Sequence, residues 1–110
     1  MTNQKTIYIA GKITGDPNYA QKFAAAEKFL TERYGYIVLN PAILPEGFSY
    51  EAYMRMTSAM LSECEIVCLL PDWIESEGAK TERKQALTEG KPLVLYASLV
   101  SLEEQHIHYK

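Results

Sequence analysis

Four short apolar runs divide the chain into a regular series. They occupy residues 6–10, 36–39, 66–70 and 93–96, and they are separated by longer segments of mixed polarity. Runs of this length that are rich in Ile, Val and Leu, and that lack alternating polar positions, are typical of strands buried on both faces. The pattern therefore predicts four strands of a parallel sheet, with the run at 66–70 as the most apolar.

The segments between these runs carry apolar residues at helical spacing. Asp16 and Pro17 predict the start of the first helix, with Asp as the N-cap and Pro at the first helical position. Gly35 predicts its end, and Ser49 is expected to cap the second helix. The third helix follows the third strand after a loop that carries Ser and Gly, and it should end at Gly90.

Strands that alternate with helices predict an α/β fold. We expect three layers (α/β/α), with a doubly wound parallel sheet of about four to five strands, as in flavodoxin-like and Rossmann-like proteins. The 110 residues suit a single domain over 1–110. Residues 97–110 leave two alternatives open, a short helix that starts near Ser101 or an extra edge strand around Ile107.

Composition narrows the classes of partner. The net charge is −3 and no cluster of Lys or Arg is present, which argues against binding to a nucleic-acid polymer. No apolar stretch is long enough to span a membrane, and the first residues lack the apolar core of a signal peptide. We therefore expect a cytoplasmic protein without a membrane partner.

The potential metal ligands are sparse. Cys64 and Cys68 flank or lie within the third strand, where small buried core residues are expected rather than a disulfide or a zinc site. His106 and His108 have no acidic or Cys partner at ligand spacing, which favours a surface tail. The sequence predicts no metal and no cofactor.

The stretch at 71–82, which follows the third strand, is the most informative for function. In a parallel sheet such a loop lies at the carboxyl edge, where open α/β sheets bind their ligands. Glu82 should lie about one turn into the next helix, with its side chain leaning back toward that edge. The helix N-terminus favours an ionised carboxylate there. Glu82 is thus a candidate nucleophile or base, and an ordinary first-turn Glu is the alternative.

The loop at 11–15 follows the first strand and contains two glycines and Lys12. A phosphate-binding P-loop is rejected, because Thr6 stands where the motif needs its first Gly and Ile13 follows the lysine in place of Ser or Thr. Backbone N–H groups and one cation remain, which suit a phosphate or a hydroxyl. A plain tight turn is an equal alternative. A dinucleotide-binding glycine pattern is also absent, which disfavours an NAD enzyme.

Other candidates lie at the same edge. Asn40 closes the second strand, and the loop at 42–48 is long enough to overhang a pocket as a lid. Tyr50, Tyr53 and Met54 come near the start of the second helix, where they could frame a flat apolar ligand. Their helical spacing fits core packing as well.

Two stretches, taken together with their spacing, match a known pattern. The first is Ile7-Tyr8-Ile9-Ala10-Gly11-Lys12-Ile13-Thr14-Gly15. The second is Leu69-Leu70-Pro71-Asp72-Trp73, followed by Ser76, Gly78, Glu82, Ala86 and Gly90-Lys91-Pro92. They resemble the nucleoside 2-deoxyribosyltransferase-like superfamily and, more narrowly, a branch of short phage and bacterial proteins described as a domain of unknown function. The resemblance extends to Tyr96.

The resemblance implies an enzyme, a nucleoside deoxyribosyltransferase or a deoxynucleotide N-glycosidase. Glu82 would attack the anomeric carbon of a 2′-deoxynucleoside or its 5′-monophosphate and form a glycosyl-enzyme intermediate. A second base or water would then release the sugar. Asp72 would lie near the base and help to protonate it.

The same resemblance implies the binding residues. Ser76, in the Ser-x-Gly pattern with Gly78, would contact the sugar or the phosphate. Gly11 and Lys12 would lie near the sugar–phosphate end of the ligand. Transferases of this superfamily complete each site with residues from a neighbouring subunit, so a homo-oligomer is expected.

The sequence departs from the pattern in two ways. Lys84 stands where many members have Gly two residues after the nucleophile, and the chain is shorter than the transferases. A non-catalytic nucleotide-binding or sensing module on the same fold is therefore the alternative to an enzyme. A phosphate-binding flavodoxin-like protein is a third, weaker possibility.

Overall fold

The computed structural model describes residues 4–108 of the chain. The elements are, in order, β1 (Thr6–Ala10), α1 (Tyr19–Tyr34), β2 (Ile37–Leu39), the 3-10 helix η1 (Pro41–Ile43), α2 (Tyr50–Ser62), β3 (Ile66–Leu69), the 3-10 helix η2 (Trp73–Glu75), α3 (Glu77–Thr88), β4 (Leu93–Leu95) and α4 (Tyr96–His108). The alternation confirms the predicted α/β class, and each strand lies within one residue of the bounds that the sequence predicted.

The strands form one parallel sheet in the order β2-β1-β3-β4. Tyr8 in β1 lies opposite Leu39 in β2 and Val67 in β3. The chain runs outward in one direction from β1 to β2 and in the other from β3 to β4, so the order reverses between β1 and β3. In open sheets a reversal of this kind opens a crevice at the carboxyl ends of the two strands.

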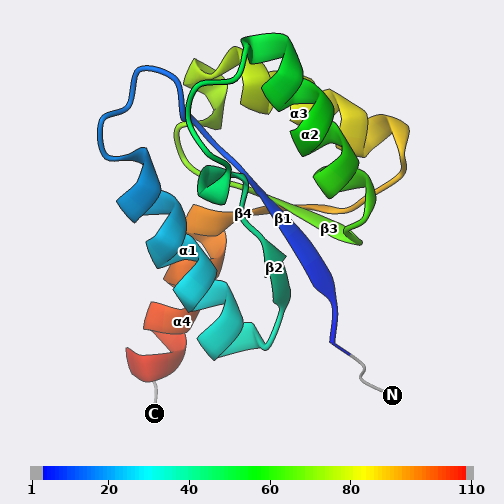
Figure 1. The fold of residues 1–110 in the computed structure, drawn as a ribbon. Helices are drawn as coiled ribbons and strands as arrows, with labels where there is room; N and C mark the ends of the chain where they lie inside the picture. Colours follow the sequence, from blue (N-terminus) through cyan, green and yellow to red (C-terminus); the bar gives the residue numbers. More distant parts are fainter. Residues whose placement is uncertain (1–3, 109–110) are drawn as a thin grey trace.

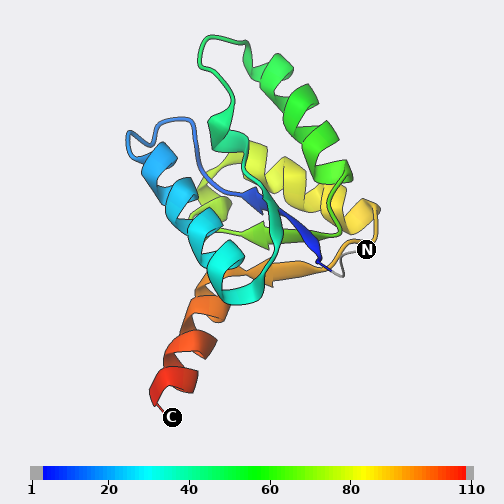
Figure 2. The ribbon, with the colours of Figure 1, turned by 60° about the horizontal axis from the view of Figure 1, so that its bottom comes forward.

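Helices cover both faces of the sheet, with α1 and α4 on one side and α2 and α3 on the other (Figures 1 and 2). The strand side chains alternate between these layers: Tyr8 and Ala10 join the core under α2 and α3, and Ile7 and Ile9 join the core under α1. Both faces are therefore dry, which explains the continuous apolar runs. The three-layer, doubly wound sheet is as predicted.

The start of α1 differs from the prediction. The helix begins at Tyr19 with Asn18 as its N-cap, two residues later than the Asp16-Pro17 pair indicated. The Asp16 carboxylate accepts a hydrogen bond from the backbone N–H of Asn18 (2.9 Å) and closes a separate turn before the helix. Asp16 also pairs with Lys22, so a tertiary contact holds its side chain away from a capping position.

The other helix ends follow the sequence more closely. Gly35 ends α1 in a left-handed conformation (φ 69°), and the Ser49 hydroxyl caps α2 by accepting from the N–H of Ala52 (3.1 Å). Ser76 caps α3 in the same way. Gly78, which was expected in the preceding loop, lies inside the first turn of α3.

The C-terminal segment forms the helix α4, which starts at Tyr96 directly after β4 and projects beyond the sheet (Figure 2). The edge-strand alternative around Ile107 is therefore wrong, and the helix starts five residues before Ser101. The side chains of His106 and His108 lie outside the described part. Cys64 and Cys68 are buried and unpaired, as predicted. Over residues 4–108, none of the helices has the length and apolar character to cross a membrane.

Candidate active site

An open cleft of about 1110 Å³ lies where β1, β2 and β3 end. Its walls come from the loop after β1, from η1, from the first half of α2 and from the segment that joins η2 to α3. The volume is slightly above the usual range for small-molecule sites, about 300–1,000 Å³. The lining is Gly11, Ile13, Thr14, Gly15, Asp16, Pro17, Tyr19, Pro41, Ala42, Leu44, Glu46, Tyr50, Tyr53, Met54, Thr57, Glu75, Ser76, Glu77, Gly78, Ala79 and Glu82.

Glu82 is the most deeply buried carboxyl of this lining, with 6% of its surface exposed. It lies on the second turn of α3, and its Oε2 accepts a hydrogen bond of 2.7 Å from the hydroxyl of Tyr8 in β1. Tyr8 is fully buried in the sheet. One of the two inner strands, β1, thus presents a fixed donor to the one buried acid of the cleft.

Burial raises the pKa of Glu82 to about 7, and hydrogen bonding by Tyr8 and Thr57 lowers it only in part. The expectation that the helix N-terminus holds Glu82 ionised is therefore corrected. The helix dipole acts mainly within the first turn, and Glu82 lies beyond it. Desolvation therefore dominates the pKa of Glu82. Burial, followed by the nearby Glu82 charge, raises the pKa of Tyr8 well above its ordinary value, which keeps Tyr8 a neutral donor.

Three expected binding residues line the same cleft, namely Gly11, Ser76 and Gly78. A Cβ on Gly11 would come within 2.8 Å of Cδ1 of Leu70, so only glycine lets the ends of β1 and β3 approach this closely. A Cβ on Gly78 would meet ordinary contacts, such as Met54 Sδ at 3.5 Å. The Ser76 Oγ accepts from the N–H of Ala79 at 3.0 Å.

Tyr53 also lines the cleft, where it fastens the loop that precedes α2. Its hydroxyl donates to the carbonyl of Pro45 (2.5 Å) and accepts from the N–H of Phe48 (3.3 Å). The ring of Phe48 packs edge-on against that of Tyr53. The expected lid loop is therefore tied to the helix that forms one wall of the cleft.

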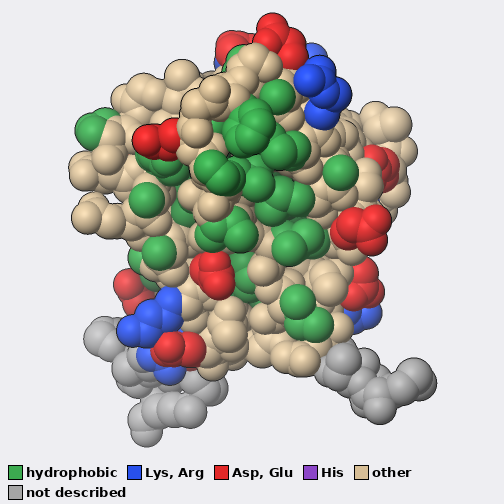
Figure 3. Space-filling view, in the orientation of Figure 1, with side chains coloured by type: hydrophobic (Ala, Val, Ile, Leu, Met, Phe, Trp, Pro, Cys, Tyr) green, Lys and Arg blue, Asp and Glu red, His purple; other side chains and the backbone are tan. Residues whose placement is uncertain are grey.

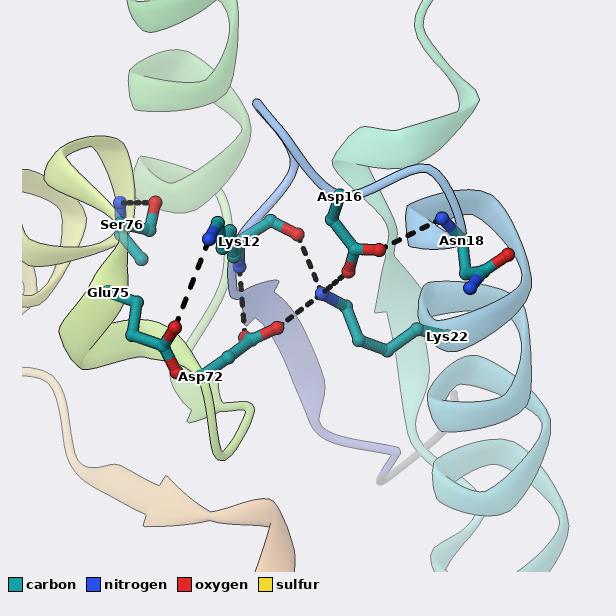
Figure 4. Close-up of polar contacts among 8 residues, drawn as sticks. Lys12, Asp16, Asn18, Lys22, Asp72, Glu75 and Ser76 are labelled. Carbon is teal, nitrogen blue, oxygen red and sulfur yellow. Dashed lines mark hydrogen bonds and ion pairs between the residues drawn. The ribbon is translucent and has the colours of Figure 1, made fainter.

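Asp72 and Lys12 do not line the cleft. One oxygen of Asp72 accepts from the backbone N–H of Lys12 (3.0 Å), and the other pairs with the ammonium of Lys22 (Figure 4). The Lys12 ammonium lies 3.9 Å from Oε1 of Glu75. Asp72 thus lies outside the cleft lining, and its expected position beside the base stays a prediction.

Lys22 on α1 joins the loop after β1 to the loop after β3 (Figure 4). These loops lie where the strand order reverses, which we call the switch point. Besides Asp72, the ammonium of Lys22 contacts Oδ2 of Asp16 (2.5 Å) and the backbone carbonyl of Lys12 (2.7 Å). Burial lowers the pKa of Lys22, but the hydrogen bonds to Asp16 and Asp72 outweigh it, so the pKa is raised. We call Lys22, Asp16, Asp72 and the Lys12 backbone the Lys22 bracket. It fixes the loop that forms the cleft wall opposite α3.

Asn40 also lies outside the cleft lining. It is buried, its Oδ1 accepts from the N–H of Ala42 (2.8 Å) and its Nδ2 donates to Oε1 of Glu27 (3.0 Å). The side chain therefore caps η1 and joins it to α1. It shapes the wall of the cleft from behind.

The sequence argument missed Tyr8 and Lys22. Tyr8 carries the only side-chain hydroxyl inside the first buried run except for Thr6 at its edge, and a buried hydroxyl needs a partner. That signal indicates an acceptor without saying which. Lys22 gives no comparable signal, because lysine is ordinary on a helix surface. Among the side chains that the structure describes (residues 4–104), no three His, Cys, Asp or Glu gather as a metal site.

The comparisons with known proteins agree with this architecture. A family model with the description "Domain of unknown function (DUF4406)" matches residues 5–95. The solved structure "2-desoxiribosyltransferase from Leishmania mexicana" is similar with a TM-score of 0.65 and 20% identity, over 83% of this chain and 63% of that one. The chain thus spans less than two thirds of that structure, and the likeness shows a deoxyribosyltransferase-like fold. No curated protein matches the sequence.

Proposed function

The chain belongs to the family described as a domain of unknown function (DUF4406), and we propose that it acts on the N-glycosidic bond of a 2′-deoxynucleoside or its 5′-monophosphate. Glu82 is the nucleophile, and either a second base or water takes the sugar. The fold shared with a 2-deoxyribosyltransferase supports this class of reaction. The observation that carries the proposal is the buried Glu82 carboxyl in the switch-point cleft.

The chemistry follows from the surroundings of Glu82. Breaking the bond between the anomeric carbon and the base nitrogen leaves positive charge on the sugar, and a fixed carboxylate both stabilises that charge and captures the carbon. The Tyr8 hydroxyl holds one oxygen of Glu82 at 2.7 Å and favours its ionised form. In this proposal Tyr8 is a positioning residue.

We do not assign protonation of the leaving base to Asp72. Both oxygens of Asp72 are engaged, one by the N–H of Lys12 and the other by the ammonium of Lys22. A general acid must reach the atom that it protonates, within hydrogen-bond distance or through one water. Asp72 belongs to the Lys22 bracket and is absent from the cleft lining.

The test is to incubate the protein with each 2′-deoxynucleoside and each 5′-monophosphate, with and without an acceptor base, and to follow release or exchange of base by chromatography. Glu82→Gln should reduce turnover at least a hundredfold, because the amide cannot act as the nucleophile. Acid-quenched wild type should carry a deoxyribosyl adduct on Glu82 by mass spectrometry. Glu32→Gln, an exposed change on α1, is the matched control. Full activity of Glu82→Gln contradicts the assignment.

The alternative is a non-catalytic nucleotide-binding or sensing module. The position of Asp72 outside the cleft lining favours it, because the residue expected to protonate the leaving base is then engaged by Lys22 and the N–H of Lys12. Thermal shifts with a panel of deoxynucleosides and nucleotides separate the two candidates. Stabilisation without any turnover supports the module, and turnover that depends on Glu82 excludes it.

We also propose that the protein is a homo-oligomer. Ile43, Phe48 and Tyr50 lie beside the cleft and are each at least half exposed, and Figure 3 shows hydrophobic side chains gathered on this face. Exposed apolar surface of this kind is typical of a site of association. Light scattering after size exclusion gives the mass directly, and a purely monomeric protein contradicts the proposal.

A further inference from the structure

We propose that this cleft selects its ligand by charge: it takes a nucleoside whose base is positively charged, such as an N-alkylated purine or a pyridinium, in preference to a neutral nucleoside, and it disfavours a 5′-phosphate. The inference rests on the proposed function, because it names the substrate class of the same site. It follows from the charges, the aromatic groups and the proton donors of the cleft lining.

The lining carries acidic side chains and no basic ones. Five carboxyl side chains line the cleft, and within residues 4–108 no Lys or Arg does so. They come from the loop after β1, the segment before α2, η2 and α3, so the acidic character surrounds the opening. These residues are Asp16, Glu46, Glu75, Glu77 and Glu82.

Three lysines pair with carboxyls of this lining. Lys22 pairs with Asp16, Lys12 lies 3.9 Å from Glu75, and Lys80 lies 3.3 Å from Glu77. These contacts offset part of three of the five charges, and none of the three lysines lines the cleft itself. Lys12, the cation that follows β1, is not in the cleft lining, and Glu75 offsets part of its charge.

The remaining two carboxyls have tyrosine partners. Glu46 accepts from the hydroxyl of Tyr19 (3.4 Å) and Glu82 from that of Tyr8 (2.7 Å). Over the described part of the chain, neither takes part in an ion pair. A hydroxyl donor stabilises a carboxylate without cancelling its charge, so Glu46, and Glu82 in its ionised form, attract a cation in the ligand.

Aromatic groups add to this preference. Tyr19, Tyr50 and Tyr53 all line the cleft. The face of a tyrosine ring attracts a cation, and sites for positively charged heterocycles and quaternary ammonium groups combine such rings with carboxylates. A neutral base gains the stacking alone, whereas a cationic base gains both effects.

One feature of the cleft favours the opposite charge. The N-terminus of α3 lies at its edge, and helix N-termini attract anions. However, the Ser76 hydroxyl takes the N–H of Ala79, and Glu77 already supplies a carboxylate to this first turn. The partial charge of a helix end is about half a unit. It is therefore outweighed by the carboxyls that surround it.

A cationic base also removes the need for a proton donor. As the bond between the anomeric carbon and the base nitrogen breaks, the electron pair stays on that nitrogen and the base leaves as a neutral molecule. An oxygen of the Glu82 carboxylate bonds to the carbon and gives a glycosyl ester. Water then replaces Glu82 on the carbon and releases one proton. Neither step calls on Asp72, which the Lys22 bracket holds elsewhere.

The experiment compares three ligands that share one base and sugar framework. These are 1-methyl-2′-deoxyadenosine, which is cationic at pH 7, 2′-deoxyadenosine, and 2′-deoxyadenosine 5′-monophosphate. Titration calorimetry on the wild-type protein at low salt should give at least tenfold tighter binding for the cation than for the neutral nucleoside. The monophosphate should bind at least tenfold more weakly than the neutral nucleoside. Both differences should shrink at high salt.

Charge variants test the cause. Glu46→Gln should reduce the preference for the cation severalfold, whereas Glu51→Gln should leave it unchanged, because the exposed Glu51 lies outside the cleft lining. Equal or tighter binding of the monophosphate overturns the inference, as does an unchanged preference in Glu46→Gln. Turnover with no charge preference leaves the proposed function standing and removes the inference. The expected order of binding without turnover leaves the charge inference standing and removes the proposed function. Failure to bind any of the three ligands removes both the inference and the proposed function.

Discussion

The hydroxyl of Tyr8 lies 2.7 Å from Oε2 of Glu82, although 74 positions separate the two residues in the chain. The contact joins the central strand to the helix that follows β3, across the interior of the molecule. It gives Glu82 a fixed orientation, while burial raises the pKa of this carboxyl to about 7. Stability and activity should therefore depend in opposite ways on the ionisation of this one group.

Glu82→Gln should stabilise the protein at alkaline pH. The pKa of Glu82 rises from its ordinary value of 4.5 to about 7 on folding, so between these values the folded state binds more protons than the unfolded state. Wild-type stability should thus fall as pH rises through this window, by up to about 3 kcal/mol. Urea unfolding from pH 4.5 to 8.5 should show that fall, and Glu82→Gln should lack it. Glu32→Gln should keep the wild-type slope, and an equal slope in all three proteins contradicts the prediction.

Tyr8→Phe should move the pH profile of turnover. The proposed nucleophile, Glu82, must be ionised, so kcat/KM should rise with pH through about 7. The Tyr8 hydrogen bond lowers the pKa of Glu82, and its loss should shift that limb to higher pH. Leaving a buried carboxylate without its donor should also reduce stability above pH 7 by about 1–3 kcal/mol. Tyr34→Phe, at a more exposed ring, serves as the control. If kcat/KM of Tyr8→Phe rises with pH at the same place as in the wild type, the Tyr8 hydroxyl does not lower the pKa of Glu82.

Lys22→Met and Asp72→Asn should have similar effects, because both break the Lys22 bracket. The loop after β1 would lose its tie to α1, so we expect KM to rise severalfold with a smaller change in kcat. The stability loss should be about 1 kcal/mol, since the pair is partly exposed. Lys28→Met, on the exposed side of α1, should change neither quantity. If Asp72→Asn instead lowers kcat alone, with loss of an alkaline limb, Asp72 acts as a proton donor.

Gly11→Ala and Gly78→Ala should change the free energy of unfolding in opposite directions. The added methyl at Gly11 would lie 2.8 Å from Cδ1 of Leu70, where two chain segments meet in the core, and we expect a loss of roughly 1–3 kcal/mol. At Gly78 the nearest atom is 3.5 Å away, and alanine in a helix should stabilise by about 0.5–1 kcal/mol. The Gly78 methyl borders the cleft, so KM should rise. Thermal unfolding and initial rates give both results, and a destabilised Gly78→Ala contradicts this account.

Local patterns were sufficient to predict the strands and most helix ends. The four apolar runs became four parallel strands, and Gly35 and Ser49 ended and capped helices as expected. These features depend on residues close together in the chain, whose conformational preferences are local. Asp16 is the informative failure. Its sequence context is that of a helix cap, but the ammonium of Lys22 holds its side chain elsewhere.

The sequence by itself determined the α/β order of the chain and the position of Glu82 at the carboxyl edge of the sheet, because hydrophobic period and strand–loop–helix order depend on neighbouring residues. Only the tertiary structure decided which polar groups meet. It joined Tyr8 to Glu82 and Lys22 to Asp72, and it set the pKa of Glu82 through burial. Desolvation and long-range pairing depend on what every other segment places around a group, and a linear pattern carries no record of that.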